Sequence, residues 1–512
     1  MLVKAFAAAL QGIHARVVTI EANCSKGIQF YLVGLPDNAV KESHERIVSA
    51  LEENGYTFPR KRLIINMAPA DLKKEGAAYD LPLAIAIQAA AERIPSDKLE
   101  SYIMMGELSL DGTLKPVKGI LPIAIKARDE GFKGVIVPKQ NAQEAAVVDN
   151  LEVYAANNIR EVIEFFKGEN TLQRETIDLS TLFEAQDHAI EADFSEVKGQ
   201  ENVKRALEVA AAGGHNIIMI GPPGAGKSMM AKRIGGILPP LTLEEALETT
   251  KIHSVAGKVG EGISLISQRP FRSPHHSISD VAMVGGGTFP QPGEISLAHN
   301  GVLFLDELPE FRRNVLEVMR QPLEDHTISI SRAKYTLDYP AGFMLVASMN
   351  PCPCGYYNHP DKHCSCTSGM VQKYLSRISG PMLDRIDIHV EITPVPFEKI
   401  SDNTPAESSE AIRQRVVKAR AIQKERFQNE EGIHCNAHIT PRLFRKYCQP
   451  SSEGLRLLKT AMERLSLSAR AYDRILKVAR TIADLENCDA IATHHIAEAI
   501  NYRSLDRENW GV

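Results

Sequence analysis

The chain has 512 residues, of which 44% are hydrophobic and 24% charged, and its formal net charge is -5 with histidine neutral. At roughly 150 residues per domain, this length predicts about three globular domains. The acidic balance excludes a globally basic nucleic-acid coat but leaves room for local basic loops. No apolar run approaches the ~18 residues of a membrane helix, and the stretch Ala5–Leu10 is too short for a signal peptide. We therefore expect a cytoplasmic protein with no membrane partner.

Composition separates three blocks. The first, residues 1–168, mixes short β-like runs with helical stretches, which is typical of an α/β domain. Its expected strands are Arg16–Glu21, Ile28–Val33, Arg62–Asn66 and Val135–Val137, and its expected helices are Glu42–Glu53, Leu81–Arg93 and Leu121–Glu130. A polar linker at 169–192 leads to a second α/β block at 193–398. The third block, 399–512, has apolar residues at three- and four-residue spacing and predicts a helical domain.

A phosphate-binding loop opens the second block. The apolar strand Ile217–Ile220 is followed at once by Gly221, Pro222, Pro223, Gly224, Ala225, Gly226, Lys227 and Ser228, and then by a helical stretch. In this GxxxxGKS order, backbone N–H groups surround phosphate oxygens in front of a helix N-terminus. We expect Lys227 to reach the β- and γ-phosphates of ATP and the Ser228 hydroxyl to bind Mg²⁺.

Two later strands carry polar residues at their carboxyl ends, where ligands of open α/β sheets bind. Asp306 and Glu307 follow the strand Val302–Leu305, and Asn350 follows Phe343–Ser348. We expect Asp306 to hold Mg²⁺ through water, Glu307 to accept the proton of the attacking water, and Asn350 to orient that water. An acidic helix N-terminus is the alternative for the two carboxylates.

A cluster of cysteines follows Asn350. The window contains Cys352, Cys354, Cys364 and Cys366, with His359 and His363 between them. Tetrahedral Zn²⁺ prefers four Cys or His ligands on two short loops. Two C-x-C elements are a less specific signal than two C-x-x-C elements, so reduced thiols in a loop remain the alternative. With no export signal, a disulfide framework is disfavoured.

Two segments carry cations suited to DNA phosphates. A long insertion after the phosphate loop contains Arg269 and Arg272, and long loops in compact domains are usually functional. The segment Thr327–Tyr339 predicts a β-hairpin with Arg332 and Lys334 at its tip. A solvated turn is the alternative for this hairpin.

The order of phosphate loop, Asp-Glu strand, polar-tipped strand and helical block resembles that of the AAA+ ATPases. The resemblance implies that Arg385 is an arginine finger and that Arg470 is the sensor-2 arginine of a helical lid. A planar, always charged guanidinium suits a γ-phosphate. An ion pair with Asp384 or Asp387 is the alternative for Arg385, and a solvated helix-start charge is the alternative for Arg470. Arg377 is a second candidate for a subunit-interface arginine.

Further motifs resemble the YifB/ComM family of magnesium-chelatase-like ATPases over nearly the whole chain. They are DFSEVKGQ from Asp193, AAAGGHN from Ala210, RPFRSPHH from Arg269, PGEISLAH from Pro292 and NPCPCG from Asn350, with Tyr31–Pro36, Ala68–Leu72 and Asp80–Pro82 in the first block. The family implies a hexameric, ATP-driven motor that acts as a DNA helicase in branch migration during natural transformation, or in related recombination. A protein-remodelling ATPase like the magnesium chelatase motor subunit is the alternative.

The first block resembles the proteolytic domain of Lon protease. A Ser/Lys dyad needs a serine after a Gly-rich turn and a lysine on a following helix. The corresponding segment Lys74–Asp80 has no serine, and Pro122 lies near the place of the lysine. We therefore interpret the block as a non-peptidase scaffold. The expected fold class is α/β: a Lon-like α/β domain, an AAA+ P-loop parallel sheet with flanking helices, and a C-terminal helical lid.

Overall fold

The computed structural model describes residues 1–178, 192–260, 262–287, 290–332, 335–357, 359–396, 406–430, 432–465, 467–503 and 505. The chain divides into two compact units. The first unit consists of Met1–Gln186, Thr242–Ser267 and Ser331–Tyr339, and the second of Asp187–Leu241, Gln268–Ile330 and Pro340–Val512. None of the helices in the described ranges combines the length and apolar character needed to span a bilayer.

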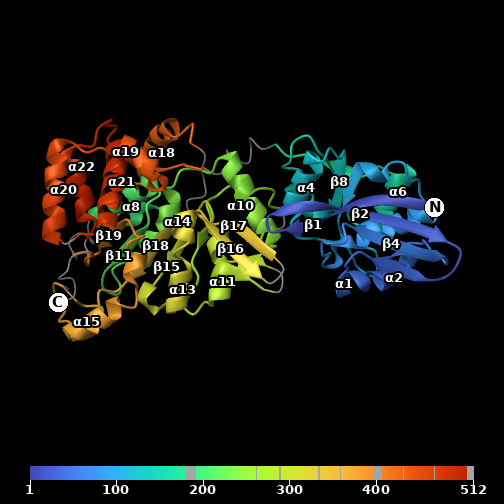
Figure 1. The fold of residues 1–512 in the computed structure, drawn as a ribbon, viewed down its shortest axis with the longest axis horizontal. Coiled ribbons are helices and arrows are strands. Elements are labelled where there is room, and N and C mark those ends of the chain that lie inside the picture. The colour runs from blue at the N-terminus through green and yellow to red at the C-terminus, as the bar shows by residue number, and fades with distance from the viewer. Residues whose placement is uncertain are drawn as a thin grey trace. The chain divides into compact units, whose positions relative to one another are not determined.

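A mixed eight-stranded sheet forms the centre of the first unit (Figure 1), in the order β10-β9-β8-β5-β1-β2-β4-β3. Its strands are β1 (Leu2–Gln11), β2 (His14–Ser25), β3 (Phe30–Val33), β4 (Arg62–Ala68), β5 (Tyr102–Met104), β8 (Gly134–Pro138), β9 (Glu152–Ala156) and β10 (Gln173–Glu175), and a small sheet pairs β6 (Glu107–Leu108) with β7 (Leu114–Lys115). The long hairpin of β1 and β2 pairs from Leu2↔Asn23 to Gln11↔His14. Its helices are α1 (Asn38–Lys41), α2 (Ser43–Glu53), α3 (Asp80–Ala90), α4 (Ile120–Asp129), α5 (Lys139–Ala145), α6 (Ile159–Lys167) and α10 (Leu243–Val255).

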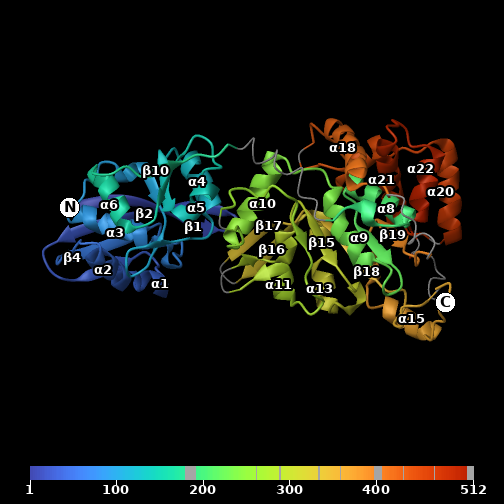
Figure 2. The same ribbon diagram turned by 180° about the vertical axis from the view of Figure 1, so that it is seen from behind.

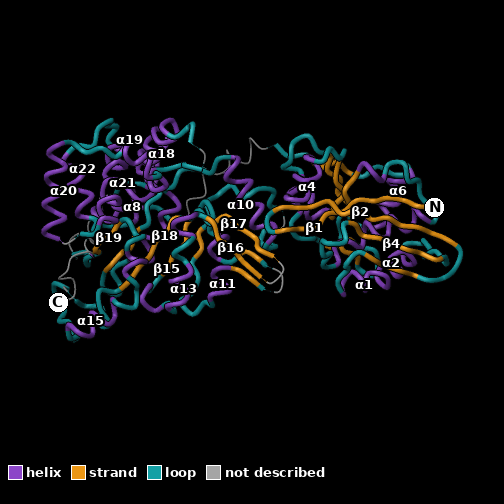
Figure 3. The backbone as a smooth tube through the Cα atoms, in the orientation of Figure 1, coloured by secondary structure: helices purple, strands orange, loops and turns teal. Residues whose placement is uncertain are grey.

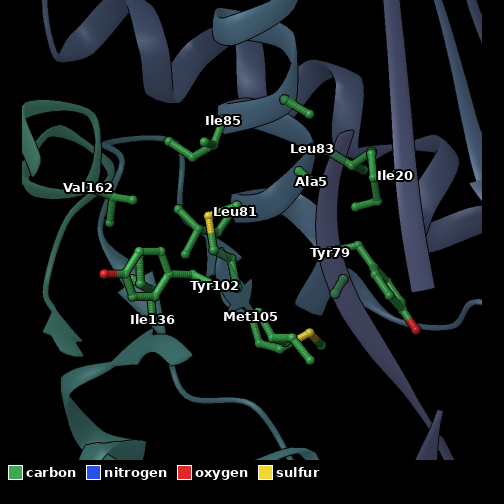
Figure 4. Close-up of a cluster of buried hydrophobic side chains, with 14 of the residues drawn as sticks. Ala5, Ile20, Tyr79, Leu81, Leu83, Ile85, Tyr102, Met105, Ile136 and Val162 are labelled. Carbon is green, nitrogen blue, oxygen red and sulfur yellow. The ribbon is translucent and has the colours of Figure 1, made fainter. Parts of the chain in front are cut away.

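The core of the first unit is built around α3, which is buried on every side. A helix that is apolar all round belongs inside a protein, and α3 packs against β1 and β2. Figure 4 shows its Leu81, Leu83 and Ile85 in one cluster with Ala5 of β1 and Ile20 of β2. Burying each leucine or isoleucine side chain stabilises the fold by about 1.5–3 kcal/mol.

The predicted elements of the first block are confirmed, but they leave out several of its strands and helices. The four expected strands appear within β2, β3, β4 and β8, and the three expected helices as α2, α3 and α4. The longest strand that was not predicted is β1, in which Ala7, Ala8 and Ala9 are all buried. A strand buried on both faces loses the alternating pattern by which strands are recognised. The expected linker 169–192 also differs, since its residues Gln173–Glu175 form strand β10 against β9.

Two segments from late in the chain belong to the first unit. Helix α10 packs on α4, and Gly119 N–H donates to the carbonyl oxygen of Ser254 at 3.1 Å. The Ser254 hydroxyl hydrogen-bonds the carboxylate of Glu144, whose pKa is raised by burial. The second segment is part of the hairpin of β16 (Thr327–Arg332) and β17 (Tyr335–Pro340), which confirms the predicted hairpin. Lys334 lies outside the described residues, as does the side chain of Arg332.

The second unit has a five-stranded parallel sheet in the order β12-β15-β18-β11-β19, with helices beside it (Figure 2). Its strands are β11 (Ile217–Ile220), β12 (Phe271–Arg272), β15 (Val302–Leu305), β18 (Met344–Met349) and β19 (Ile388–Glu391), and a small sheet pairs β13 (Gly285–Gly286) with β14 (Gln291–Pro292). Its earlier helices are α8 (Glu201–Gly213), α9 (Lys227–Arg233), α11 (Asp280–Val284), α12 (Glu294–Leu297), α13 (Arg313–Val318), α14 (Pro322–Asp325), α15 (Ser368–Leu375) and α16 (Gly380–Leu383).

The end of the chain is helical, as Figure 3 shows in purple. Its helices are α18 (Ser409–Arg426), α19 (Pro441–Tyr447), α20 (Ser452–Leu465), α21 (Ala469–Leu485) and α22 (Thr493–Asn501). Helices α18 and α21 pack on α8, and one hydrophobic core runs from the strands into these helices. The helical block predicted from apolar spacing is therefore present and shares the core of the parallel sheet.

A buried ion pair ties α2 to the start of α3. Arg46 donates to both carboxylate oxygens of Asp80, at 2.7 and 2.9 Å, and Leu108 N–H donates to the same carboxylate at 3.2 Å. The Asp80 side chain has 0% exposure, and burial raises its pKa against the opposing effect of Arg46. Removing one partner of such a pair leaves an uncompensated charge in the core.

We predict that Arg46→Leu lowers the free energy of unfolding of the first unit by about 3–5 kcal/mol, because the buried Asp80 carboxylate loses its ion pair with Arg46. Chemical denaturation of the full chain, followed by circular dichroism, measures this loss. The double variant Arg46→Leu/Asp80→Leu removes both charges and is expected to lose less. A single variant as stable as the wild type would contradict the prediction.

Candidate active site

The ends of three parallel strands meet at one edge of the second sheet. Strand β18 lies between β11 and β15, so the residues that follow these strands are neighbours. The Ser228 hydroxyl donates to one oxygen of Asp306 at 2.6 Å, and the Ser348 hydroxyl hydrogen-bonds the other oxygen. A serine hydroxyl and a carboxylate side by side are oxygen ligands that suit Mg²⁺. The two residues predicted to hold Mg²⁺ therefore lie together.

Lys227 connects the phosphate loop to Asn350. Its ammonium group donates to the carbonyl oxygens of Gly221 and Pro222, at 2.7 and 2.9 Å, and to Asn350 Oδ1 at 3.1 Å. Burial lowers the pKa of Lys227, while the nearby Asp306 and Glu307 act in the opposite direction. Gly224 and Gly226 have φ values of 79° and 87°, which glycine adopts without strain. Such turns aim backbone N–H groups at one point and favour anions.

Glu307 stands beside a cavity of about 540 Å³ lined by Glu310, Asn350, Pro353, Met370, Lys373, Tyr374 and Arg377. Its φ of 54° is unusual for a residue other than glycine, and such conformations cluster at functional sites. Its side chain remains 55% exposed, as a group that must meet water requires. Arg377, the second candidate for an interface arginine, also lines this cavity and pairs with Glu310 at 2.7 Å.

His276 is a neighbour of Glu307 that sequence reasoning did not assign to the site. Its Nδ1 lies 3.6 Å from Glu307 Oε2. The reason is topological: β12 pairs in parallel with β15, so the residues after Arg272 arrive at the same edge as Glu307. The signal was available in the polar residues that follow the short run at Phe271, but that run was too short to be recognised as a strand.

The predicted arginine finger and sensor-2 arginine lie together in a different cavity, of about 460 Å³. Arg385 is only 6% exposed and pairs with Glu324 at 2.6 Å, so its partner is neither of the expected aspartates. Arg470 follows Ser468, the N-cap of α21, and lies 3.2 Å from Asp384. Within the described residues, neither arginine lines the cavity beside Glu307.

Two of the predicted DNA-contact residues are engaged inside the fold. Arg269 donates to the carbonyl oxygens of Pro239 and Asn300, at 2.6 and 2.7 Å. Arg272 forms a bidentate pair with Glu294, at 2.6 and 2.8 Å. These guanidiniums anchor the insertion to its surroundings, and their contact with DNA stays a prediction. The sequence did not reveal this because their partners are backbone carbonyls and a distant carboxylate.

The four clustered cysteines converge on one point. Their Sγ atoms all lie within 4.8 Å of one another, with Cys352, Cys354 and Cys364 separated by 3.4–3.7 Å. Four sulfurs at about 2.3 Å from a tetrahedral Zn²⁺ stand roughly 3.8 Å apart. Tyr357 N–H donates to Cys352 Sγ at 3.3 Å. The donor set therefore fits structural zinc.

Comparison with known proteins identifies related chains. Sequence profiles of three parts of the magnesium chelatase subunit match in order: "Subunit ChlI of Mg-chelatase" at residues 20–141, "Magnesium chelatase, subunit ChlI" at 193–400, and "Magnesium chelatase, subunit ChlI C-terminal" at 406–503. The uncharacterized protein YifB of Escherichia coli is 46% identical over 97% of this chain and 96% of its own. Competence protein ComM of Haemophilus influenzae is 42% identical over 98% and 97%. Lon protease 2 of Bacillus subtilis is 30% identical over only 24% and 22%.

We predict that Glu307→Gln binds ATP as the wild type does but hydrolyses it at least ~10²-fold more slowly, because the proton acceptor is lost while the phosphate loop is intact. Phosphate release and binding of a fluorescent ATP analogue measure the two properties. Glu130→Gln, a change at an exposed glutamate of the first unit paired with Lys126, is the matched control. Near-normal turnover of Glu307→Gln would remove this residue from the reaction.

Proposed function

Since this chain belongs to the YifB/ComM family of magnesium-chelatase-like AAA+ ATPases, we propose that it is a hexameric ring motor. In this proposal, ATP hydrolysis moves DNA and drives branch migration in recombination or natural transformation. The observation that carries the proposal is that the predicted site residues lie in two separate places. Lys227, Ser228, Asp306, Glu307 and Asn350 gather at one sheet edge, whereas Arg385 and Arg470 line another cavity.

The residues at the sheet edge divide the work of hydrolysis. Lys227 and the loop N–H groups bind the phosphates, and Ser228 and Asp306 hold Mg²⁺, which neutralises phosphate charge when bound. Glu307 accepts the proton of the attacking water, and Asn350 holds that water in line. Asn350 Oδ1 accepts a hydrogen bond from the Lys227 ammonium group at 3.1 Å. The amide assigned to the water and the ammonium group assigned to the phosphates therefore lie side by side.

The arginine that completes the active site around the γ-phosphate comes from a neighbouring subunit. Arg385 and Arg470 share a cavity with Arg445, Arg474 and Lys477, and these cations outnumber the acidic lining residues Glu324, Asp384 and Asp473. A basic surface of this kind suits the γ-phosphate of a nucleotide bound to the next copy. Arg385 reaches it by leaving Glu324, whose side chain is 49% exposed and easily solvated. In the proposed ring, ATP lies between subunits, the neighbour supplies Arg385, and Arg470 is the sensor-2 arginine of the helical lid.

The hairpin of β16 and β17 is the proposed DNA contact. Arg269 and Arg272 have partners within the fold, which leaves Arg332 and Lys334 as the cations assigned to DNA. A two-cation tip repeated around a ring supplies a ring of phosphate contacts. The alternative is a motor that remodels a protein partner, which the resemblance to the magnesium chelatase motor subunit implies. A peptidase is disfavoured because the segment Lys74–Asp80 has no serine.

Hydrolysis rates test the proposal when measured without DNA, with single strands, with duplex and with a four-way junction. We predict stimulation by DNA, and that Arg332→Ala/Lys334→Ala loses it while basal hydrolysis remains. The slope of log affinity against log salt should also become shallower, because each lost phosphate contact removes roughly one unit. Stimulation by a protein partner and by none of the DNAs would favour the remodelling alternative.

Mixing inactive variants tests action between subunits. We predict that Arg385→Ala and Lys227→Ala are each inactive alone but regain part of the activity when mixed, because some interfaces then join an intact phosphate loop to an intact arginine. Steady-state hydrolysis over a range of mixing ratios is the measurement. If no mixture exceeds its parents, Arg385 does not act on a neighbour.

A further inference from the structure

The four-cysteine loop forms part of the wall of the cavity beside Glu307. Pro353, which stands between Cys352 and Cys354, lines that cavity together with Glu307 and Asn350. Asn350 itself is two positions before Cys352, which is fully buried. The position of the loop therefore decides the shape of the space in which the attacking water stands.

The same loop contacts the phosphate loop. Gly355 has a φ of 84°, and a Cβ atom built on it would lie 2.6 Å from the Cδ atom of Pro223. This close approach means that the cysteine loop packs directly on the loop that surrounds the phosphates. A shift of the cysteine loop therefore displaces Pro223 as well as Asn350.

The other end of the cluster leads into α15. Cys366 is followed at once by Thr367, the N-cap whose side chain accepts from Met370 N–H. Helix α15 contributes Met370, Lys373 and Tyr374 to the cavity wall. Tyr374 thus lines the same cavity as Asn350, the residue that follows strand β18 where the loop begins.

We infer that a zinc ion held by Cys352, Cys354, Cys364 and Cys366 controls ATP hydrolysis without contacting the nucleotide. The ion closes a loop whose two ends both contribute residues to the wall of the cavity beside Glu307. Loss of the ion frees Pro353 and α15, and small displacements of positioning groups cost roughly 10²-fold in rate. Nucleotide binding, which rests on Lys227 and the phosphate loop, is retained. This inference rests on the proposed ATPase function but not on DNA as the partner.

The test compares Cys364→Ser/Cys366→Ser with the wild-type chain. Cys488→Ser changes an exposed cysteine outside the cluster and is the control. We expect about one zinc per wild-type and control chain by elemental analysis, and none in the double variant. Hydrolysis by the double variant should fall roughly 10- to 100-fold, while affinity for a fluorescent ATP analogue changes less than about threefold. Amide exchange in α15 should accelerate about tenfold.

Reversible metal removal covers the case in which the double variant fails to fold. Wild-type protein is stripped with a chelator and then given Zn²⁺ alone, and both hydrolysis and α15 protection should return. The inference is overturned if the wild type binds no zinc, or if zinc leaves while hydrolysis and α15 exchange stay unchanged. Failure of DNA to stimulate hydrolysis would refute the DNA motor and leave this result standing.

Discussion

The carboxylate of Asp306 is the point on which the site depends. It accepts from Ser228, at the start of α9, and from Ser348, near the end of β18, while itself following β15. The Asp306 side chain thus holds the start of α9 and the ends of β15 and β18 in register. Because the strands are parallel and their order is set by buried apolar side chains, this register brings Lys227 within hydrogen-bond distance of Asn350. The chemistry of the edge is in this sense a product of strand order.

Local patterns were sufficient wherever chemistry is local. The phosphate loop needs glycine at fixed positions and a strand before it, so Gly224, Gly226 and Lys227 could be assigned from spacing alone. Asp306 and Asn350 could be assigned to the same site because the carboxyl ends of parallel strands meet at one edge of the sheet. The cysteines could be grouped because they are close in sequence. In the same way, amphipathic helices such as α2 were visible, whereas β1 was hidden by burial on both faces.

The remaining assignments depend on distant partners, which spacing does not encode. Arg269 and Arg272 have the composition of a DNA-binding loop, yet their bonds go to Asn300 and Glu294. Arg385 pairs with Glu324 and not with the aspartates beside it in sequence. Glu324 is distant in sequence, and the fold brings its helix next to Arg385. His276 lies beside Glu307 because β12, a strand of only two residues, directs the chain to that edge of the sheet. In each case the tertiary arrangement, and not residue type, decided the partner.

The division of the chain into two units has a consequence for its modularity. The chain passes from one unit to the other after Gln186, Leu241, Ser267, Ile330 and Tyr339. Cutting the backbone between residues 178 and 192 would therefore sever one connection of several. Leu247 of α10 would still pack on the core of the first unit. The N-terminal block is thus interwoven with the rest of the chain, and a gene fragment encoding only residues 1–168 would lack part of the unit's own surface.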